Sequence, residues 1–156
     1  MQAIDCLNQV ADFHRTFQHP ILETPQIPSK QRCDLRVSLI AEELKELEEA
    51  IEEKDIVAVA DALADIQYVL AGAILEFGLG NKFRALFDEV QRSNMSKACT
   101  TIEEAEATMK FYAEEKGVES YYKEKEGKYL VYRKGDDKTL KNINYSPADL
   151  QTILNS

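Results

Sequence analysis

The sequence is poor in the residues from which many catalytic and metal centres are built. Its 156 residues include no tryptophan, two histidines and three cysteines. Di-iron bundles take a Glu-x-x-His pair from each of two helices, and no histidine follows His19, which argues against that class of site. The cysteines are Cys6, Cys33 and Cys99. They are widely spaced, odd in number and without a CxxC motif, which predicts free thiols in a reducing compartment such as the cytoplasm.

Positive charge is also scarce. The net charge of -9 at pH 7 argues against a protein that binds duplex nucleic acid. The first residues lack the basic start and long apolar run of a secretory signal, so none is expected. With 44% apolar and 30% charged residues, the composition is typical of a soluble globular protein. The length predicts a single domain over residues 1–156.

The charges are unevenly distributed. Residues 42–65 carry ten acids and two lysines, whereas residues 121–141 carry seven bases and four acids. An acidic pocket together with a basic tail suits a metal-bound anionic ligand such as a polyphosphate. An ordinary solvated surface has the same appearance, so charge alone leaves both interpretations open.

The acidic segment predicts a hairpin of two helices joined at Glu52–Asp55. Apolar residues spaced by three and four predict the first helix: Val37, Ile40, Leu44, Leu47 and Ile51. The second helix, Ile56 to Leu75, is apolar nearly all round, which predicts a buried central helix. Asp61 and Asp65 near its middle argue against a membrane span.

Folding this hairpin about Lys54 brings four carboxylates to one level. Glu43 lies eleven residues before the turn and Asp65 eleven after it; Glu46 lies eight before and Asp61 seven after. Four converging carboxylates would repel one another and raise their pKa values, unless a divalent cation neutralises them. All-oxygen ligands indicate Mg²⁺ or Mn²⁺. The alternative is that Glu43 and Glu46 belong to an ordinary acidic helix face.

The flanking segments predict further helices and one hairpin. A first helix over residues 2–17 leads into a connector, 20–29, that is rich in proline. His14 and His19 could reach a ligand, although such histidines more often cap helices or lie partly buried. A helix from Lys82 to about Met95 follows. A capping box at Thr101 and Glu104 starts another, which Gly117 ends.

The end of the chain changes character. Aromatic and basic residues alternate on both sides of Glu126-Gly127, which predicts a β-hairpin. This alternation could also mark a nucleic-acid surface, but a small hairpin packed on the helical bundle is the favoured interpretation. Ser146-Pro147 predicts the start of a short last helix, with proline at its first position.

The motifs Glu42-Glu43-Leu44-Lys45-Glu46 and Asp61-Ala62-Leu63-Ala64-Asp65 resemble the EExxE and ExxD pattern of the MazG-like nucleoside triphosphate pyrophosphohydrolases, in the branch related to phosphoribosyl-ATP pyrophosphohydrolase. The likeness extends to residues 92–97 and to residues 137–150. It implies an all-α fold, a MazG-like helical bundle with a four-helix core, here with a small C-terminal β-hairpin in an extension over residues 118–141.

The resemblance also implies roles for single residues. Glu43, Glu46 and Asp65 match metal ligands, and Glu42 matches a further carboxylate that acts on the metal or the attacking water. The glutamate of ExxD falls on Ala62, and Asp61 is the residue expected to replace it. Four polar residues match positions expected to contact phosphates: Asn94, Lys97, Lys138 and Lys141.

The implied reaction is Mg²⁺- or Mn²⁺-dependent hydrolysis of a (deoxy)nucleoside triphosphate to the monophosphate and pyrophosphate. The alternatives are phosphoribosyl-ATP pyrophosphohydrolysis and a non-catalytic bundle that binds metal or nucleotide. The helix Ile56–Leu75 is apolar on more faces than one chain can cover, which predicts a homodimer or a dimer of dimers. Nucleobase contacts are expected from the N-terminal helix and the connector, and neither nucleic acid nor membrane is an expected partner.

Overall fold

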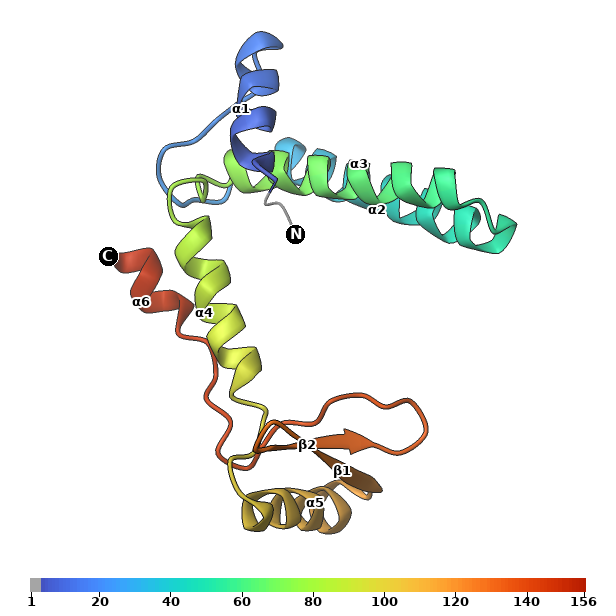
Figure 1. Ribbon diagram of the computed structural model, residues 1–156. Coiled ribbons are helices and arrows are strands. Elements are labelled where there is room, and N and C mark those ends of the chain that lie inside the picture. Colours follow the sequence, from blue (N-terminus) through green and yellow to red (C-terminus); the bar gives the residue numbers. More distant parts are fainter. Residues whose placement is uncertain (1–3) are drawn as a thin grey trace. The chain divides into compact units, whose positions relative to one another are not determined.

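The computed structural model describes residues 4–156, and its internal contacts divide the chain into two compact units, Met1–Phe83 and Arg84–Ser156. Each unit is described by itself below. The described residues form six helices and one two-stranded antiparallel sheet (Figure 1). The predicted fold class, all-α with a small C-terminal hairpin, is therefore confirmed. The single domain expected over residues 1–156 stays a prediction.

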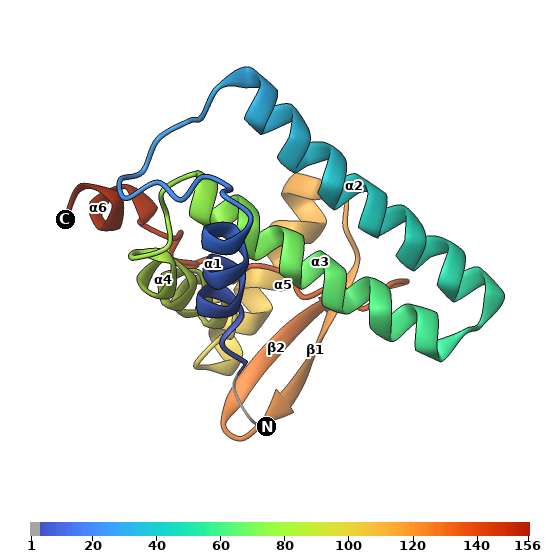
Figure 2. The ribbon, with the colours of Figure 1, turned by 90° about the horizontal axis from the view of Figure 1, so that it is seen from above.

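The first unit is built on the predicted helical hairpin. Helix α2 (Lys30–Glu53) and helix α3 (Ile56–Glu76) run side by side in Figures 1 and 2. Lys54 ends α2 in the left-handed conformation, with φ of 58°. The Asp55 carboxylate then caps α3 by accepting hydrogen bonds from the backbone amides of Val57 and Ala58, at 2.9 and 3.1 Å. The turn is thus centred on Lys54, as the pairing of the acids required.

Helix α1 (Cys6–Thr16) covers the C-terminal part of α3. Its residues Val10 and Ala11 pack with Ala71 and Leu75 in a small buried core. The Asp5 carboxylate caps α1, which therefore begins later than the predicted residue 2; residues 2 and 3 lie outside the described part of the chain.

The connector between α1 and α2 is bound to the end of α3. The Leu22 and Gln26 amides donate to the carbonyls of Leu75 and Phe77, at 3.0 and 3.1 Å. Gly78 makes this approach possible, because its φ is +69° and an added Cβ would lie 1.9 Å from the Thr24 carbonyl oxygen. No other residue fits there without moving the connector.

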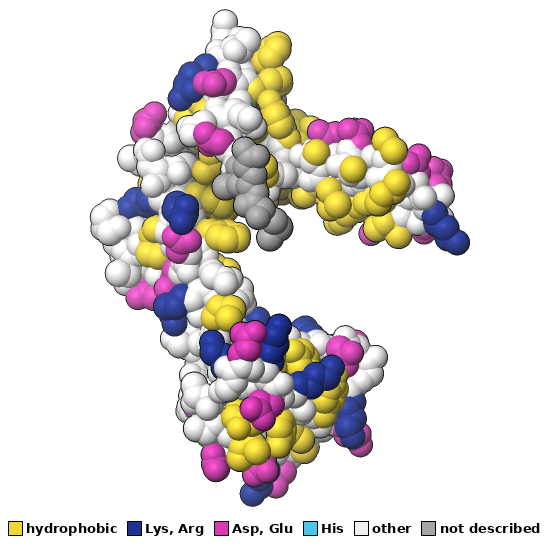
Figure 3. Space-filling model, in the orientation of Figure 1, with side chains coloured by type: hydrophobic (Ala, Val, Ile, Leu, Met, Phe, Trp, Pro, Cys, Tyr) yellow, Lys and Arg dark blue, Asp and Glu magenta, His cyan; other side chains and the backbone are white. Residues whose placement is uncertain are grey.

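Much of α3 is exposed, and the expectation of a buried central helix is wrong for its N-terminal half. Ile56 and Val57 are 76% and 75% exposed, because among the described residues 4–83 only α2 packs beside that half. Figure 3 shows apolar side chains over the visible surface of the hairpin. Helix α3 is also the one helix among residues 4–156 long and apolar enough to cross a membrane by length and composition, although it carries Asp61 and Asp65.

The second unit has its own core. It contains α4 (Phe83–Met95, starting one residue before the boundary), α5 (Ile102–Lys116), β1 (Ser120–Lys125), β2 (Lys128–Arg133) and α6 (Leu150–Asn155). The buried side chains come from α5, the sheet and the flanking segments: Cys99, Ala105, Val131 and Leu140. The Thr101 cap, the Gly117 ending and the turn at Glu126-Gly127 are as predicted. The hairpin packs on α5.

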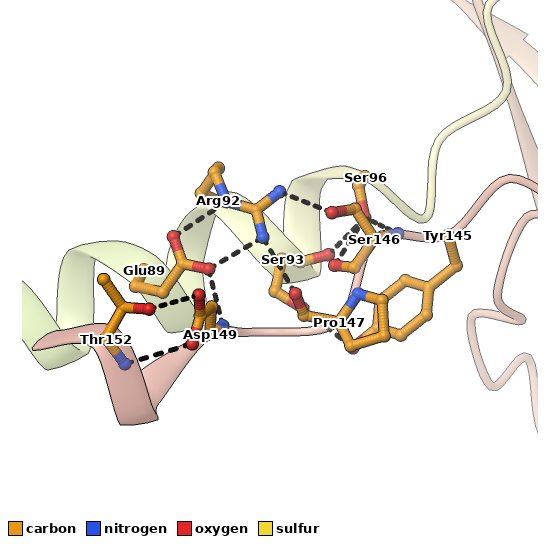
Figure 4. A network of polar contacts seen from close by, with 9 residues as sticks. All are labelled: Glu89, Arg92, Ser93, Ser96, Tyr145, Ser146, Pro147, Asp149 and Thr152. Atoms are coloured by element: carbon orange, nitrogen blue, oxygen red, sulfur yellow. Dashed lines mark hydrogen bonds and ion pairs between the residues drawn. The ribbon is translucent and has the colours of Figure 1, made fainter.

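The last helix begins at Leu150, so the prediction that it starts at Pro147 is wrong. Arg92 on α4 holds the preceding segment extended, donating to the Ser146 hydroxyl and the Pro147 carbonyl, both at 3.0 Å (Figure 4). The Asp149 carboxylate then caps the helix by accepting from the Thr152 amide at 3.1 Å. Capping by Asp149 therefore decides where the helix starts.

Candidate metal and nucleotide site

The acids of α2 and α3 gather around Glu43. Glu43 is half-buried, while Glu42, Glu46, Asp61 and Asp65 are exposed. Burial raises the pKa of the Glu43 carboxyl above its usual value, and the negative charges of Asp65, Glu46, Glu42 and Asp61 raise it further, in that order. Asp65 on α3 is therefore the strongest acidic neighbour of Glu43. The hairpin brings all five predicted carboxylates within electrostatic reach of one another; below they are called the acidic cluster.

The acidic cluster has the donor chemistry of a divalent-cation site. Lys45, which lies between Glu43 and Glu46 on α2, forms an ion pair with Glu49 at 3.0 Å. Within residues 4–156, no three His, Cys, Asp or Glu side chains already form a group that could hold a metal ion. Carboxylate oxygens are ligands that fit Mg²⁺ or Mn²⁺. The individual ligand roles stay predictions.

The position of the missing family glutamate is occupied by a core residue. Ala62 is buried, 3% exposed, whereas Asp61 beside it is exposed. Asp61 contributes to the raised pKa of Glu43, but least among the four acids. Its replacement of the glutamate therefore stays a prediction too.

A cavity of about 210 Å³ lies beside the acidic cluster; we call it the α1 cavity. It is lined from α2 by Leu39, four residues before Glu43, and from α3 by Tyr68, three residues after Asp65. The cavity therefore begins one helical turn away from the acids. Phe13 and His14 of α1 also line it, as does His19, which precedes the connector 20–29. Nucleobase contacts from this region stay a prediction.

Aromatic rings line this cavity. The Phe13 ring stacks on His19 with centroids 5.9 Å apart, and it meets the edge of Tyr68 at 5.6 Å. Both Phe13 and Tyr68 are partly exposed to solvent. Such a wall suits a planar, apolar group such as a nucleobase.

A buried ionic network forms one side of the cavity. Glu76 is fully buried and accepts hydrogen bonds from Arg32 and Arg36; the Arg32 Nε contact is 2.9 Å. Burial opposes ionisation of the Glu76 carboxyl, but the two arginines outweigh it and lower its pKa below the usual range. Arg36, 7% exposed, also has a buried Nε atom that finds no hydrogen-bond partner among residues 4–156.

His14 completes the network in its neutral form. Its Nδ1 lies 2.9 Å from the Pro20 carbonyl oxygen, which can only accept, so Nδ1 carries the proton. Nε2 then accepts from Arg36 at 3.2 Å. Burial lowers the pKa of His14, which keeps the ring uncharged. Gly72 leaves room for this pair, because an added Cβ would lie 2.6 Å from Arg36 Nη1.

Sequence reasoning missed Arg32, Arg36 and Glu76 as members of a site. The signal was present in two places. Arg32 and Arg36 are four apart and therefore share a helix face. Glu76 ends a mostly apolar helix, on the line of residues that runs from Asp61 through Asp65 and Gly72.

The predicted phosphate contacts lie in the second unit. Lys97, Lys138 and Lys141 line one cavity of about 300 Å³. Asn94 does not line it, but its side-chain oxygen accepts from Lys97 Nζ at 2.8 Å. The structure thus brings the three lysines together, while their contact with a substrate stays a prediction.

Comparison with known proteins places the chain beside a described family and a viral protein. A family model described as phosphoribosyl-ATP pyrophosphohydrolase matches residues 10–94, more than half of the chain. An uncharacterised protein of Acanthamoeba polyphaga mimivirus, L479, is 32% identical over 92 residues. That match covers 56% of this chain and 37% of the viral protein, so the chain spans well under two thirds of this relative.

Proposed function

This chain belongs to the phosphoribosyl-ATP pyrophosphohydrolase family, and from that premise we propose that it hydrolyses a nucleoside or deoxynucleoside triphosphate between the α and β phosphates. The products are the nucleoside monophosphate and pyrophosphate. Family membership indicates a pyrophosphohydrolase, a hydrolase that acts on acid anhydrides. The observation that carries the finer proposal is the gathering of Glu42, Glu46, Asp61 and Asp65 around Glu43 on the α2–α3 hairpin, close enough for their charges to act on it. A divalent cation would neutralise such a group of carboxylates.

Glu43, Glu46 and Asp65 would hold the divalent metal, with Asp61 in place of the glutamate missing at Ala62. When bound, Mg²⁺ supplies positive charge against the phosphates and lowers the pKa of a bound water. Glu42, exposed beside Glu43, accepts the proton of the attacking water. A carboxylate is a weak base in water but sufficient next to a metal.

The α1 cavity would take the base of the nucleotide. Phe13, His19 and Tyr68 offer rings for stacking, and the cavity begins one helical turn from the acidic cluster. The Arg36–Glu76 pair fixes the shape of one wall. Lys97, Lys138 and Lys141 line one cavity of the second unit, and we propose for them the expected role of point charges that bind phosphate.

We assign the exposed apolar face of α3 to a second copy of the chain. Ile56, Val57 and Leu63 are all more than half exposed, and an apolar face of this kind is typical of an interface. Two copies related by a two-fold axis would cover each other's hairpins and complete a four-helix core. Light scattering at micromolar concentration should show a dimer or a dimer of dimers; a monomer would contradict this assignment.

The function is tested by pyrophosphate release from a panel of ribo- and deoxyribonucleoside triphosphates, with Mg²⁺, with Mn²⁺ and with EDTA. Release that requires metal supports the proposal, and the panel ranks the bases. Phosphoribosyl-ATP belongs in the same panel, because the matched family is named for it. Cleavage of phosphoribosyl-ATP alone would replace the proposed substrate. No cleavage of any compound would favour a non-catalytic bundle.

A further inference from the structure

The α1 cavity has two chemically different ends. Near the acidic cluster it is lined by Leu39 and Tyr68. It is also lined by Arg32 and Arg36, which both donate hydrogen bonds to the buried Glu76. We call the part of the cavity at these two arginines the arginine end. The base that the proposed function places in this cavity therefore has guanidinium groups within reach.

The pairing of the two helices fixes the order of these groups along the hairpin. Arg32 binds Glu76 across the hairpin, and Arg36 lies next to Gly72, one turn closer to the acidic cluster. Glu43 follows Arg32 by eleven residues, which is about three helical turns, so the two side chains share one face of α2. A nucleotide whose phosphates meet the acidic cluster therefore directs the edge of its base that lies away from the sugar, its outer edge, toward the arginine end.

The arginine end carries hydrogen-bond donors and an excess of positive charge. Arg32 binds Glu76 through Nε and Nη2, whereas its Nη1 makes no hydrogen bond to any residue from 4 to 156, and its side chain is 27% exposed. The two guanidinium groups of Arg32 and Arg36 share the single carboxylate of Glu76, which leaves one positive charge without a counter-charge. A guanidinium group donates hydrogen bonds and cannot accept them, so this end favours an acceptor on the ligand.

The acceptors close to the two arginines are already engaged. Glu76 accepts from both Arg32 and Arg36. The His14 ring directs Nε2 at Arg36 and Nδ1 at the Pro20 carbonyl. Within residues 4–156, no aspartate or glutamate lines the cavity. A base with an amino group at this end would place its N–H donors against the donors of Arg32, and a donor left unpaired on burial is costly.

We propose that the arginine end selects nucleotides whose base presents a carbonyl oxygen on its outer edge, as uracil and thymine do, over those with an amino group at the same position, as in cytosine. Arg32 is the residue that determines this specificity, because its free Nη1 can donate to such a carbonyl. Arg36 adds positive charge behind it. This inference rests on the proposed function for the position of the phosphates and deepens it by naming the class of base.

The test compares UTP with CTP, because their bases differ only in this carbonyl or amino group and in the ring nitrogen beside it. With Mg²⁺, kcat/KM for pyrophosphate release from UTP should exceed that from CTP by about 10- to 100-fold, the range of one hydrogen bond to a charged group. The same preference is expected between dUTP and dCTP, because the sugar does not reach the arginine end. Release from UTP and CTP with equal kcat/KM would overturn the proposal.

A conservative variant tests the role of Arg32. Arg32→Lys keeps a positive charge beside Glu76 but removes the planar fork of N–H groups. The preference for UTP over CTP should fall toward one, through a loss of UTP cleavage. This ratio does not depend on how much of the variant folds, since both substrates meet the same protein. The matched control is Arg15→Lys on α1, an exposed arginine that pairs with Asp12 outside the cavity and should keep the wild-type ratio.

A wild-type ratio in Arg32→Lys would refute the role of this residue, and so would an equal loss of the ratio in Arg15→Lys. Binding of UMP and CMP to the wild-type chain in EDTA, measured by calorimetric titration, then separates this proposal from the hydrolysis itself. Tighter binding of UMP supports the base preference even where no triphosphate is cleaved, a result that would refute only the hydrolysis. Cleavage of triphosphates together with equal binding of UMP and CMP would refute only the base preference.

Discussion

Helix α3 carries carboxylates in two opposite environments. At its C-terminal end, Glu76 is buried and neutralised by Arg32 and Arg36, and its pKa is lowered. Near its middle, Asp65 is exposed and adds to the negative charge around Glu43, whose pKa is raised. The chain thus pairs the acid that it buries with two arginines, whereas no ion pair is formed among residues 4–156 by the acids that gather around Glu43. Charge that the fold leaves uncompensated points to a ligand, whereas compensated charge supports the fold.

The largest effect is expected in the acidic cluster, whose carboxylates have no positively charged partner described above. Glu43→Gln removes the carboxylate at the centre of the acidic cluster, and metal-dependent pyrophosphate release should fall by more than about 100-fold, beyond the loss typical of groups that only orient a metal ligand. Circular dichroism should show an intact helical fold. Glu48→Gln, an exposed acid on the same helix, serves as the control. Full activity of Glu43→Gln would refute the metal-site assignment.

At Glu76, which Arg32 and Arg36 neutralise, the expected effect is on the stability of the fold. Glu76→Gln leaves Arg36 buried without its anion, which should lower the free energy of unfolding by about 3–5 kcal/mol. Urea denaturation followed by circular dichroism measures it. The exposed Glu52→Gln should change the free energy of unfolding by less than about 0.5 kcal/mol. If the two variants unfold alike, the buried network contributes nothing to the fold.

A smaller loss is expected from crowding the network without changing its charge. In Gly72→Ala the new methyl group would lie 2.6 Å from Arg36 Nη1 and 3.1 Å from His14 Nε2. Displacing either side chain should cost about 1–3 kcal/mol of unfolding free energy, seen as a lower melting temperature. An unchanged melting temperature would show that Arg36 can move aside freely.

The buried network and the acidic cluster should also respond in opposite ways to acid. The pKa of His14 is lowered from 6.5 by burial, so the unfolded chain takes up this proton first and stability falls as the pH drops below about 6.5. The pKa of Glu76 is lowered from 4.5, so its contribution is lost only below that pH. Glu43 acts in the other sense: its raised pKa means that protonation on acidification relieves repulsion in the folded state. Urea denaturation between pH 8 and pH 4 should show that the free energy of unfolding of the wild type begins to fall below about pH 6.5. In His14→Gln this fall should be absent.

The smallest expected effect is a difference in stability between Glu43→Gln and the wild type, which should change sign when Mg²⁺ is added. In EDTA, Glu43→Gln should be more stable than wild type by roughly 0.5 kcal/mol, because repulsion with neighbouring carboxylates is relieved. With Mg²⁺ the order should reverse, since only the wild type gains binding energy. Melting temperatures under both conditions test this. The same order in both would mean that Glu43 does not bind the metal.

The fold could be predicted where local chemistry decides it. The turn at Lys54, the capping of α5 by Thr101 and the hairpin at Glu126-Gly127 all follow from short-range signals. The start of α6 could not be predicted, because Arg92, more than fifty residues away, holds Ser146 and Pro147 in an extended segment. Burial of α3 was overestimated for a similar reason: apolar periodicity shows which faces seek a partner but not whether this chain provides one.

The candidate site was predictable only in part. Helix geometry placed Glu43 level with Asp65 because a two-residue turn leaves little freedom. The shared helix face of Arg32 and Arg36 was visible in the sequence, but its pairing with Glu76 was not, because Arg32 lies 44 residues away from Glu76. The gathering of Lys97, Lys138 and Lys141 around one cavity likewise depends on how α5 and the hairpin pack, which sequence spacing does not contain.

The buried position of Cys99 has a practical consequence. Its side chain is fully buried in the core of the second unit, and burial raises the pKa of its thiol. Cys6 and Cys33, both in the first unit, are only half-buried. A thiol-labelling reagent will therefore reach the first unit's cysteines in the native protein, and Cys99 only once the second unit opens. The chain carries its own chemical reporter of that opening, with no introduced probe.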